Sequence, residues 1–170
     1  MLTLMIGGAS SGKSRFAEEL VERLPGQKVY LATMEPFGEE NRKRIARHRE
    51  MRKGKGFETL ECAVHPASVS LPAEANVLLE DLPNLVANEM FSPAGRGTDH
   101  LLDELLALKD RCAHLTVVTG ELFSGGKIYE EETLSYLKAL AALNNALAQE
   151  ADLVVEIVSS LPNVLKGTIP

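Results

Sequence analysis

A run of residues near the start of the chain has the types and spacing of a phosphate-binding loop. It reads Gly7, Gly8, Ala9, Ser10, Ser11, Gly12, Lys13 and Ser14, which fits the pattern Gly-x-x-x-x-Gly-Lys-Ser/Thr. Glycines let the backbone turn its N–H groups onto phosphate oxygens, and a following helix directs its positive end at the same anion. We expect Lys13 to act catalytically on the β- and γ-phosphates of a nucleoside triphosphate, and the Ser14 hydroxyl to bind Mg²⁺.

Carboxylates follow two of the expected strands. The apolar stretch 76–79 ends in Glu80 and Asp81, and Glu61 lies at the end of the stretch 57–62, just before Cys62. Enzymes with a phosphate loop place an acidic group near their Mg²⁺, so Glu80 is predicted to share the metal with Ser14. The alternative is an ordinary strand end with solvated acids.

A strongly basic helix is expected at 39–53, with one histidine in it. Arg44, His48 and Arg52 are spaced so that they share one helix face. One interpretation is a solvated basic face, and another is a surface for RNA or DNA. The third is a triphosphate site in which His48 attacks phosphorus, because neighbouring guanidinium groups favour the neutral imidazole and would bind the pyrophosphate leaving group.

Strand and helix signals alternate along the whole chain. Strands are expected at 2–6, 28–33, 57–62, 76–81, 115–119, 152–158 and 163–165, and helices at 13–24, 39–53, 82–91, 98–113 and 131–150. Thr98 is expected to cap the fourth helix, and 123–127 to form a second glycine-bearing loop. The pattern predicts a single domain, 1–170, with an α/β P-loop NTPase-type three-layer fold: a mostly parallel sheet with helices on both faces. Ligands of such sheets bind beyond the carboxyl ends of the strands.

Composition narrows the class of protein. The chain has 170 residues, 45% hydrophobic and 25% charged, which is ordinary for one globular domain. A net charge of −6 argues against general nucleic-acid binding, which needs a cationic surface. Cys62 and Cys112 lie far apart and match no zinc-binding spacing. The apolar run 2–6 is too short for a signal-peptide core or a membrane span, so we expect a cytoplasmic protein.

Motifs along nearly the whole chain resemble one family, the bifunctional adenosylcobinamide kinase/adenosylcobinamide-phosphate guanylyltransferases of cobalamin biosynthesis. The matching stretches, in chain order, are 7–18, 30–33, 44–49, 59–62, 78–80, 86–88, 117–119, 143–144 and 164–167. The phosphate loop alone is not specific, whereas its combination with the Arg-Ile-x-x-His stretch 44–48 is. The chain departs from the usual family pattern at Ser10, Asp81 and Gly120.

The resemblance implies two reactions. ATP or GTP phosphorylates the aminopropanol hydroxyl of adenosylcobinamide, and GTP then guanylylates a histidine that passes GMP to the new phosphate. His48 is the implied guanylylated residue, and a homo-oligomer, with trimers expected, is implied as well. The phosphate loop 7–14 would contact nucleotide, and the further implied nucleotide contacts are Thr33, Met34, Arg49, Arg52, Glu61 and Glu80.

Two alternatives stay open from the sequence. The chain could retain only one of the two half-reactions, or it could be a P-loop regulatory or RNA-binding ATPase that docks through the basic helix. The remaining histidines, His65, His100 and His114, are expected to be structural or solvated.

Overall fold

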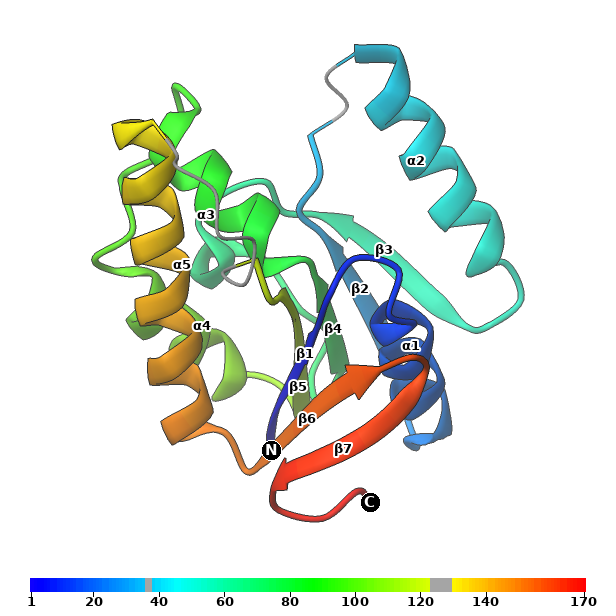
Figure 1. The fold of residues 1–170 in the computed structure, drawn as a ribbon. Helices are drawn as coiled ribbons and strands as arrows, with labels where there is room; N and C mark the ends of the chain where they lie inside the picture. The colour runs from blue at the N-terminus through cyan, green and yellow to red at the C-terminus, as the bar shows by residue number, and fades with distance from the viewer. Residues whose placement is uncertain (36–37, 123–129) are drawn as a thin grey trace.

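A seven-stranded sheet forms the centre of the molecule (Figure 1). The computed structural model describes residues 1–35, 38–122 and 130–170, apart from the side chains of Glu40, Arg44, His48 and Met51. The strands are β1 (Leu2–Gly7), β2 (Lys28–Ala32), β3 (Phe57–Glu61), β4 (Asn76–Glu80), β5 (His114–Gly120), β6 (Leu153–Val158) and β7 (Leu161–Lys166). The helices are α1 (Lys13–Arg23), α2 (Gly38–Met51), α3 (Leu82–Phe91), α4 (Leu101–Lys109) and α5 (Glu131–Glu150).

The strand order is β3-β2-β4-β5-β1-β6-β7, and every neighbouring pair is parallel except β6 with β7. Parallel pairing brings the carboxyl ends of β1, β2, β3 and β4 to the same edge of the sheet. The phosphate loop follows β1, and Glu61 and Glu80 are the last residues of β3 and β4. The sheet therefore gathers the loop and both predicted carboxylates at one edge.

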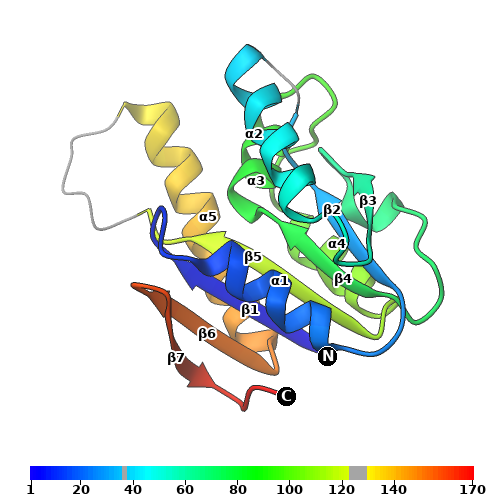
Figure 2. The ribbon, with the colours of Figure 1, turned by 90° about the vertical axis from the view of Figure 1, so that its right-hand side faces the viewer.

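Helices cover both faces of the sheet, as the sequence predicts (Figures 1 and 2). One hydrophobic cluster joins the strands to α3, α4 and α5, and a second joins them to α1. The alternation of side chains along β1 divides the two, because Leu4 belongs to the first cluster and Met5 to the second. The remaining helix, α2, lies over the β2–β3 side of the sheet (Figure 1).

Two predicted elements differ from the structure. The helix expected at 98–113 is the shorter α4, and the predicted cap at Thr98 is wrong. The Thr98 carbonyl instead accepts a turn hydrogen bond from Leu101 N, and His100 is the residue before the helix. The strand expected at 163–165 is the longer β7, which returns antiparallel to β6 through a tight turn at Ser159 and Ser160, both with positive φ. The loop expected at 123–127 lies outside the described residues.

Two further findings concern the chain as a whole. Over the described residues, the structure contains no helix with the length and apolar character needed to cross a membrane. Both cysteines are free thiols, with Cys62 buried and Cys112 partly so.

Candidate nucleotide-binding and active site

The phosphate loop lies between β1 and α1, where the sequence places it. Gly12 precedes the helix with φ of 92°, and a Cβ there would lie 2.7 Å from Ser160 Oγ. A Cβ on Gly7 would lie 2.5 Å from Ser11 Oγ and 2.9 Å from the Ile157 carbonyl. Both positions therefore require glycine, one for its conformation and both for space. The loop therefore lies closely against the end of β6 and the turn that precedes β7.

Lys13 is the first residue of α1, and its side chain lies along the loop. Its Nζ donates a hydrogen bond to the Gly8 carbonyl at 3.2 Å. The hydroxyl of Ser11 is buried and has no hydrogen-bond partner among the described residues. The loop therefore presents an ammonium group and an unused hydroxyl at the N-terminal end of α1, which is an arrangement suited to an anion.

Glu80 lies at the end of β4, beside the phosphate loop. Burial raises the pKa of its carboxyl to about 7 from 4.5, while a hydrogen-bond interaction with Ser14 and the charge of Lys13 act in the opposite direction. Its Oε2 is buried without a hydrogen-bond partner among the described residues. A buried carboxylate oxygen beside a serine hydroxyl fits the oxygen ligands that Mg²⁺ prefers. The fold therefore brings Ser14 and Glu80 together, while their binding of Mg²⁺ stays a prediction.

Thr33 braces the backbone around Glu80. It is fully buried, and its hydroxyl donates to the Asp81 carbonyl and accepts from Asp81 N, both at 2.8 Å. Thr33 N also donates to the Glu80 carbonyl at 3.2 Å. From α3, Asn88 donates to the carbonyls of Thr33 and Ala63, at 2.8 and 2.9 Å. These contacts hold the ends of β2, β3 and β4 together; a nucleotide contact by Thr33 stays a prediction.

Asp81 has a defined role as the N-cap of α3. Its carboxylate accepts a hydrogen bond from Asn84 N at 2.9 Å, which satisfies one of the free N–H groups at the start of that helix. Asp81 is one of the positions at which the chain departs from the usual family pattern, and here it stabilises the start of α3.

A cleft runs between α2 and the ends of β2 and β4. It is lined by Tyr30, Ala32, Met34, Ile45, Arg49, Arg52, Glu80, Asp81 and Asn84. An adjoining hollow on the β3 side adds Glu35, Arg42, Ala46, Glu61 and Ala63 to Ala32, Met34, Ile45 and Arg49. Five of the residues that the resemblance implies as nucleotide contacts line these two spaces: Met34, Arg49, Arg52, Glu61 and Glu80. Glu80 lines this cleft and also interacts with Ser14 of the phosphate loop, so it connects the two.

Arg52 is buried, which its position in a basic run does not predict. Its guanidinium carbon lies 3.4 Å from the centre of the Tyr30 ring, and the side chain is 6% exposed. Nε and Nη1 are buried and make no hydrogen bond to any described residue. A buried guanidinium with unused donors at the wall of a cleft is a favourable partner for a phosphate or a carboxylate. Tyr30 is a site residue that the sequence analysis missed, since only the fold brings β2 beneath the end of α2.

The exposed side of the cleft carries an ion pair. Arg49 Nη2 lies 2.6 Å from Glu61 Oε1, and both side chains are more than half exposed. A second pair joins Lys55, after α2, to the buried Glu18 of α1 at 2.5 Å. Glu18 carries no site prediction, but its position in α1 links the basic segment to the helix that follows the phosphate loop.

The backbone of His48 is part of α2, and its side chain is outside the described part of the structure. The role that the family resemblance implies for the imidazole of His48 therefore stays a prediction.

The fold and the site define a P-loop nucleotide-binding enzyme with an arginine-lined cleft next to the phosphate loop. Residues 3–165 match the model of the family described as cobinamide kinase / cobinamide phosphate guanyltransferase. The chain belongs to this family, a group of bifunctional transferases of adenosylcobalamin biosynthesis, and it is such an enzyme. The alternative of a regulatory or RNA-binding ATPase is not supported by this match.

Relatives match over nearly the full length. The chain is 31% identical to the bifunctional adenosylcobalamin biosynthesis protein CobU of Salmonella typhimurium, over 95% of this chain and 97% of the relative. It is 29% identical to the bifunctional adenosylcobalamin biosynthesis protein CobP of Pseudomonas aeruginosa, over 98% of both chains. Among solved structures, the P4 protein of bacteriophage phi6 in complex with ADP aligns with a TM-score of 0.42 and 9% identity, over 96% of this chain and 52% of that one. That likeness is too distant to inform the site.

Proposed function

We propose that this chain catalyses both half-reactions at a site formed by the phosphate loop and the α2 cleft together. The observation that carries this proposal is the position of Glu80, which lies beside Ser14 and also lines the cleft with Arg49 and Arg52. A triphosphate bound at the loop would extend its nucleoside toward the arginines. The substrates are adenosylcobinamide and ATP or GTP for the first step, and adenosylcobinamide phosphate and GTP for the second.

In the kinase step, the aminopropanol hydroxyl oxygen forms a bond to the γ-phosphorus while the bond from that phosphorus to the β-γ bridging oxygen breaks. The hydroxyl proton is lost and a nucleoside diphosphate leaves. Lys13 and the N–H groups of the loop stabilise the charge that develops on the phosphate oxygens. To reach the phosphates, Lys13 exchanges its hydrogen bond to the Gly8 carbonyl for one to the nucleotide.

Ser14 and Glu80 would hold Mg²⁺ through the serine hydroxyl and the buried Oε2. When bound there, the ion would supply positive charge that offsets the negative charge of the phosphates. Metal binding needs the ionised form of Glu80. The pKa of its carboxyl is about 7 in the free protein, and the positive charges of a bound cation and of Lys13 both favour the ionised form.

In the guanylyltransfer step, a nitrogen of His48 forms a bond to the α-phosphorus of GTP as the bond to pyrophosphate breaks. The proton on the other ring nitrogen is released. An oxygen of the corrinoid phosphate then forms the new bond to phosphorus, the N–P bond breaks, and the ring regains its proton. Arg49 and Arg52 carry the positive charge that binds the phosphates and the leaving pyrophosphate.

We also infer a homo-oligomer, a trimer on the family resemblance, in which β7 contributes the contact. Apolar side chains are exposed at the end of β6, Val158, and on the edge strand β7, where they are Leu161, Val164 and Leu165. Exposed apolar groups on an unpaired strand edge favour association. A cytoplasmic location stays a prediction.

The test separates the two reactions. His48→Ala is expected to abolish guanylyl transfer and leave corrinoid phosphorylation within a few fold, because only one reaction uses the imidazole. Lys13→Ala is expected to slow both by about 100-fold or more, since it removes a charge that acts on transferred phosphates. Lys138→Ala, at an exposed lysine on α5, is the control and should leave both unchanged. Equal loss of both activities in His48→Ala would contradict the proposal.

A further inference from the structure

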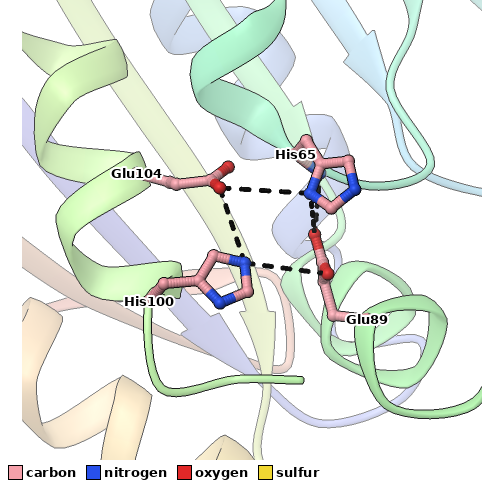
Figure 3. Close-up of side chains that lie close together, drawn as sticks. All are labelled: His65, Glu89, His100 and Glu104. Carbon is pink, nitrogen blue, oxygen red and sulfur yellow. Dashed lines mark hydrogen bonds and ion pairs between the residues drawn. The ribbon is translucent and has the colours of Figure 1, made fainter. Parts of the chain in front are cut away.

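Outside the nucleotide site, four side chains from three segments converge on one point (Figure 3). His65 precedes the short 3₁₀ helix Pro66–Ser68 after β3, Glu89 lies on α3, and His100 and Glu104 lie at the start of α4. One nitrogen or oxygen from each of the four lies within 4.8 Å of the others. From the sequence, both histidines are expected to be structural or solvated, because nothing in their spacing along the chain connects them.

The hydrogen bonding of His65 fixes which nitrogen faces the group. Its Nε2 lies 2.9 Å from the Ala94 carbonyl, which can only accept, so Nε2 carries the proton. In a neutral ring Nδ1 then carries a lone pair and can only accept a hydrogen bond. It nevertheless lies 3.2 Å from Glu89 Oε1 and 4.0 Å from Glu104 Oε1, which are also acceptors. Two acceptors at this distance repel each other unless a cation or a proton lies between them. Nδ1 makes no hydrogen bond to any residue that the structure describes.

The two carboxylates are held in place by backbone donors. Glu89 is fully buried, and its oxygens accept from His65 N at 2.7 Å and Arg96 N at 2.9 Å. Glu104 Oε2 accepts from Ala67 N at 3.3 Å. Each oxygen has a second lone pair, and the ion pairs described for both carboxylates are to histidine. A buried carboxylate needs a compensating positive charge, which the group itself does not contain while both rings are neutral.

His100 completes the group. Its Nε2 lies 3.4 Å from Glu104 Oε1 and 3.8 Å from Glu89 Oε2, and it is buried without a hydrogen bond to any described residue. Two ring nitrogens without hydrogen bonds to described residues therefore face two oriented carboxylates. Figure 3 shows the four ligand atoms pointing inward from the loop after β3, α3 and α4.

We propose that His65 Nδ1, His100 Nε2 and one oxygen each from Glu89 and Glu104 bind a divalent transition-metal ion of the zinc class. Imidazole nitrogen and carboxylate oxygen are ligands that Zn²⁺ accepts, and two carboxylates with two neutral rings balance its charge. Zinc bonds of about 2.0–2.2 Å in a tetrahedron give ligand separations of about 3.3–3.6 Å. The separations of 3.2 Å from His65 Nδ1 to Glu89 Oε1 and 3.4 Å from His100 Nε2 to Glu104 Oε1 already match. The 4.0 Å from His65 Nδ1 to Glu104 Oε1 closes with a small side-chain rotation. His100 Nε2 lies 3.8 Å from the other oxygen of Glu89, Oε2, so the Glu89 carboxylate or the His100 ring turns until a single Glu89 oxygen serves both histidines.

The surroundings of the four ligands agree with a metal site. A histidine that binds metal usually donates its other N–H to a carbonyl or a carboxylate, as His65 does to Ala94. Four protein ligands leave no open position, which is typical of a structural ion rather than a catalytic one. Glu89 directly follows Asn88 in the chain, and the Asn88 side chain donates hydrogen bonds to the carbonyls of Thr33 and Ala63. The ion would therefore stabilise the segment that supports the nucleotide cleft.

Zinc binding to the full-length protein tests the proposal directly. The protein is stripped with a chelator, dialysed and titrated with Zn²⁺ alone, without nucleotide or Mg²⁺. We expect one tightly bound ion per chain by elemental analysis, and an unfolding temperature higher by several degrees, because the ion binds only the folded state. Absence of both binding and stabilisation would overturn the proposal and leave protonated histidines as the compensating charge.

Matched substitutions locate the ion. His100→Gln and Glu104→Gln keep much of the side-chain shape and should weaken zinc binding by more than about tenfold. Asp103→Asn alters the exposed carboxylate next to Glu104 on the same helix and should bind zinc as the unaltered chain does. Zinc bound equally by all three variants would place the ion elsewhere and refute the assignment. Should a variant fail to fold, as judged by circular dichroism, the titration of the unaltered chain decides alone.

Discussion

Glu80 is the residue at which the two halves of the site meet. It ends β4, lies beside Ser14 and Lys13, and lines the cleft under α2. Burial raises the pKa of its carboxyl to about 7, so the free protein holds a group that is readily ionised by a nearby cation. Such a carboxyl suits a site that exchanges Mg²⁺ with its nucleotide, and it makes the stability of the free enzyme depend on pH.

The first prediction concerns that dependence. The folded pKa lies above the unfolded value near 4.5, so the folded state holds the Glu80 proton more tightly. As pH rises from about 4.5 through 7, the unfolded chain ionises more easily, and the free energy of unfolding falls by at most about 3 kcal/mol. Glu80→Gln removes this cost and should be more stable than the unaltered chain at pH 8, with little difference at pH 4.

Denaturant unfolding across this pH range, without metal or nucleotide, measures the effect. Glu58→Gln, at an exposed carboxylate on β3, serves as the control and should follow the unaltered chain at every pH. A Glu80→Gln profile parallel to that of the control would show that Glu80 is not the group responsible.

At the scale of elements, the attachment of α2 decides the shape of the cleft. The helix itself is polar and exposed along much of its surface, and the contacts that tie its C-terminal end to the body are the Arg52–Tyr30 stack and the Lys55–Glu18 pair. A guanidinium stacked on a desolvated aromatic ring contributes about 2 kcal/mol. Arg52 therefore supports the fold as well as offering donors to a ligand.

The second prediction separates Arg52 from its neighbour Arg49. Arg52→Lys keeps the charge but loses the planar stack, so the free energy of unfolding should fall by about 1–2 kcal/mol. Arg49→Lys, in the exposed pair with Glu61, should change it by less than about 0.5 kcal/mol. Chemical denaturation of the two variants provides the comparison, and equal effects would mean that the Tyr30 stack does not anchor α2.

The sequence predicts local elements better than the contacts between them. The phosphate loop, α3 and α5 follow from glycine placement, capping and apolar spacing, and these signals lie within each segment. The stack of Arg52 on Tyr30 and the group around Glu89 depend on side chains that meet only after the sheet forms. His65 and Glu89 are 24 positions apart, and no periodicity relates them. The predicted cap at Thr98 was wrong because a nearby turn starts α4 later.

At the scale of the molecule, the sheet connects every part of the proposed site. Two hydrophobic clusters, one on each face, share the central strands, so we expect residues 1–170 to unfold in one cooperative transition. The apolar side chains on β7 lie outside both clusters. Their exposure is explained if β7 packs against another copy of the chain.

The third prediction tests that contact. Leu161 is 70% exposed at the start of β7, and Leu161→Glu should shift the species measured by light scattering from a trimer toward single chains. The charge would be buried at a contact between copies, which is costly. Leu134→Glu, at a 41% exposed leucine on α5, is the control and should leave the molar mass unchanged. An unaltered mass for Leu161→Glu would exclude β7 from the interface.

The central claim is that His48 becomes covalently bonded to the phosphorus of a guanosine nucleotide. Intact-protein mass spectrometry after incubation with GTP and Mg²⁺ tests it most directly. The account predicts a mass gain of one guanylyl group per chain, stable in base and lost in acid, mapping to His48 and missing from His48→Ala. Protein that never gains this mass, or a His48→Ala variant that gains it equally, would contradict the account.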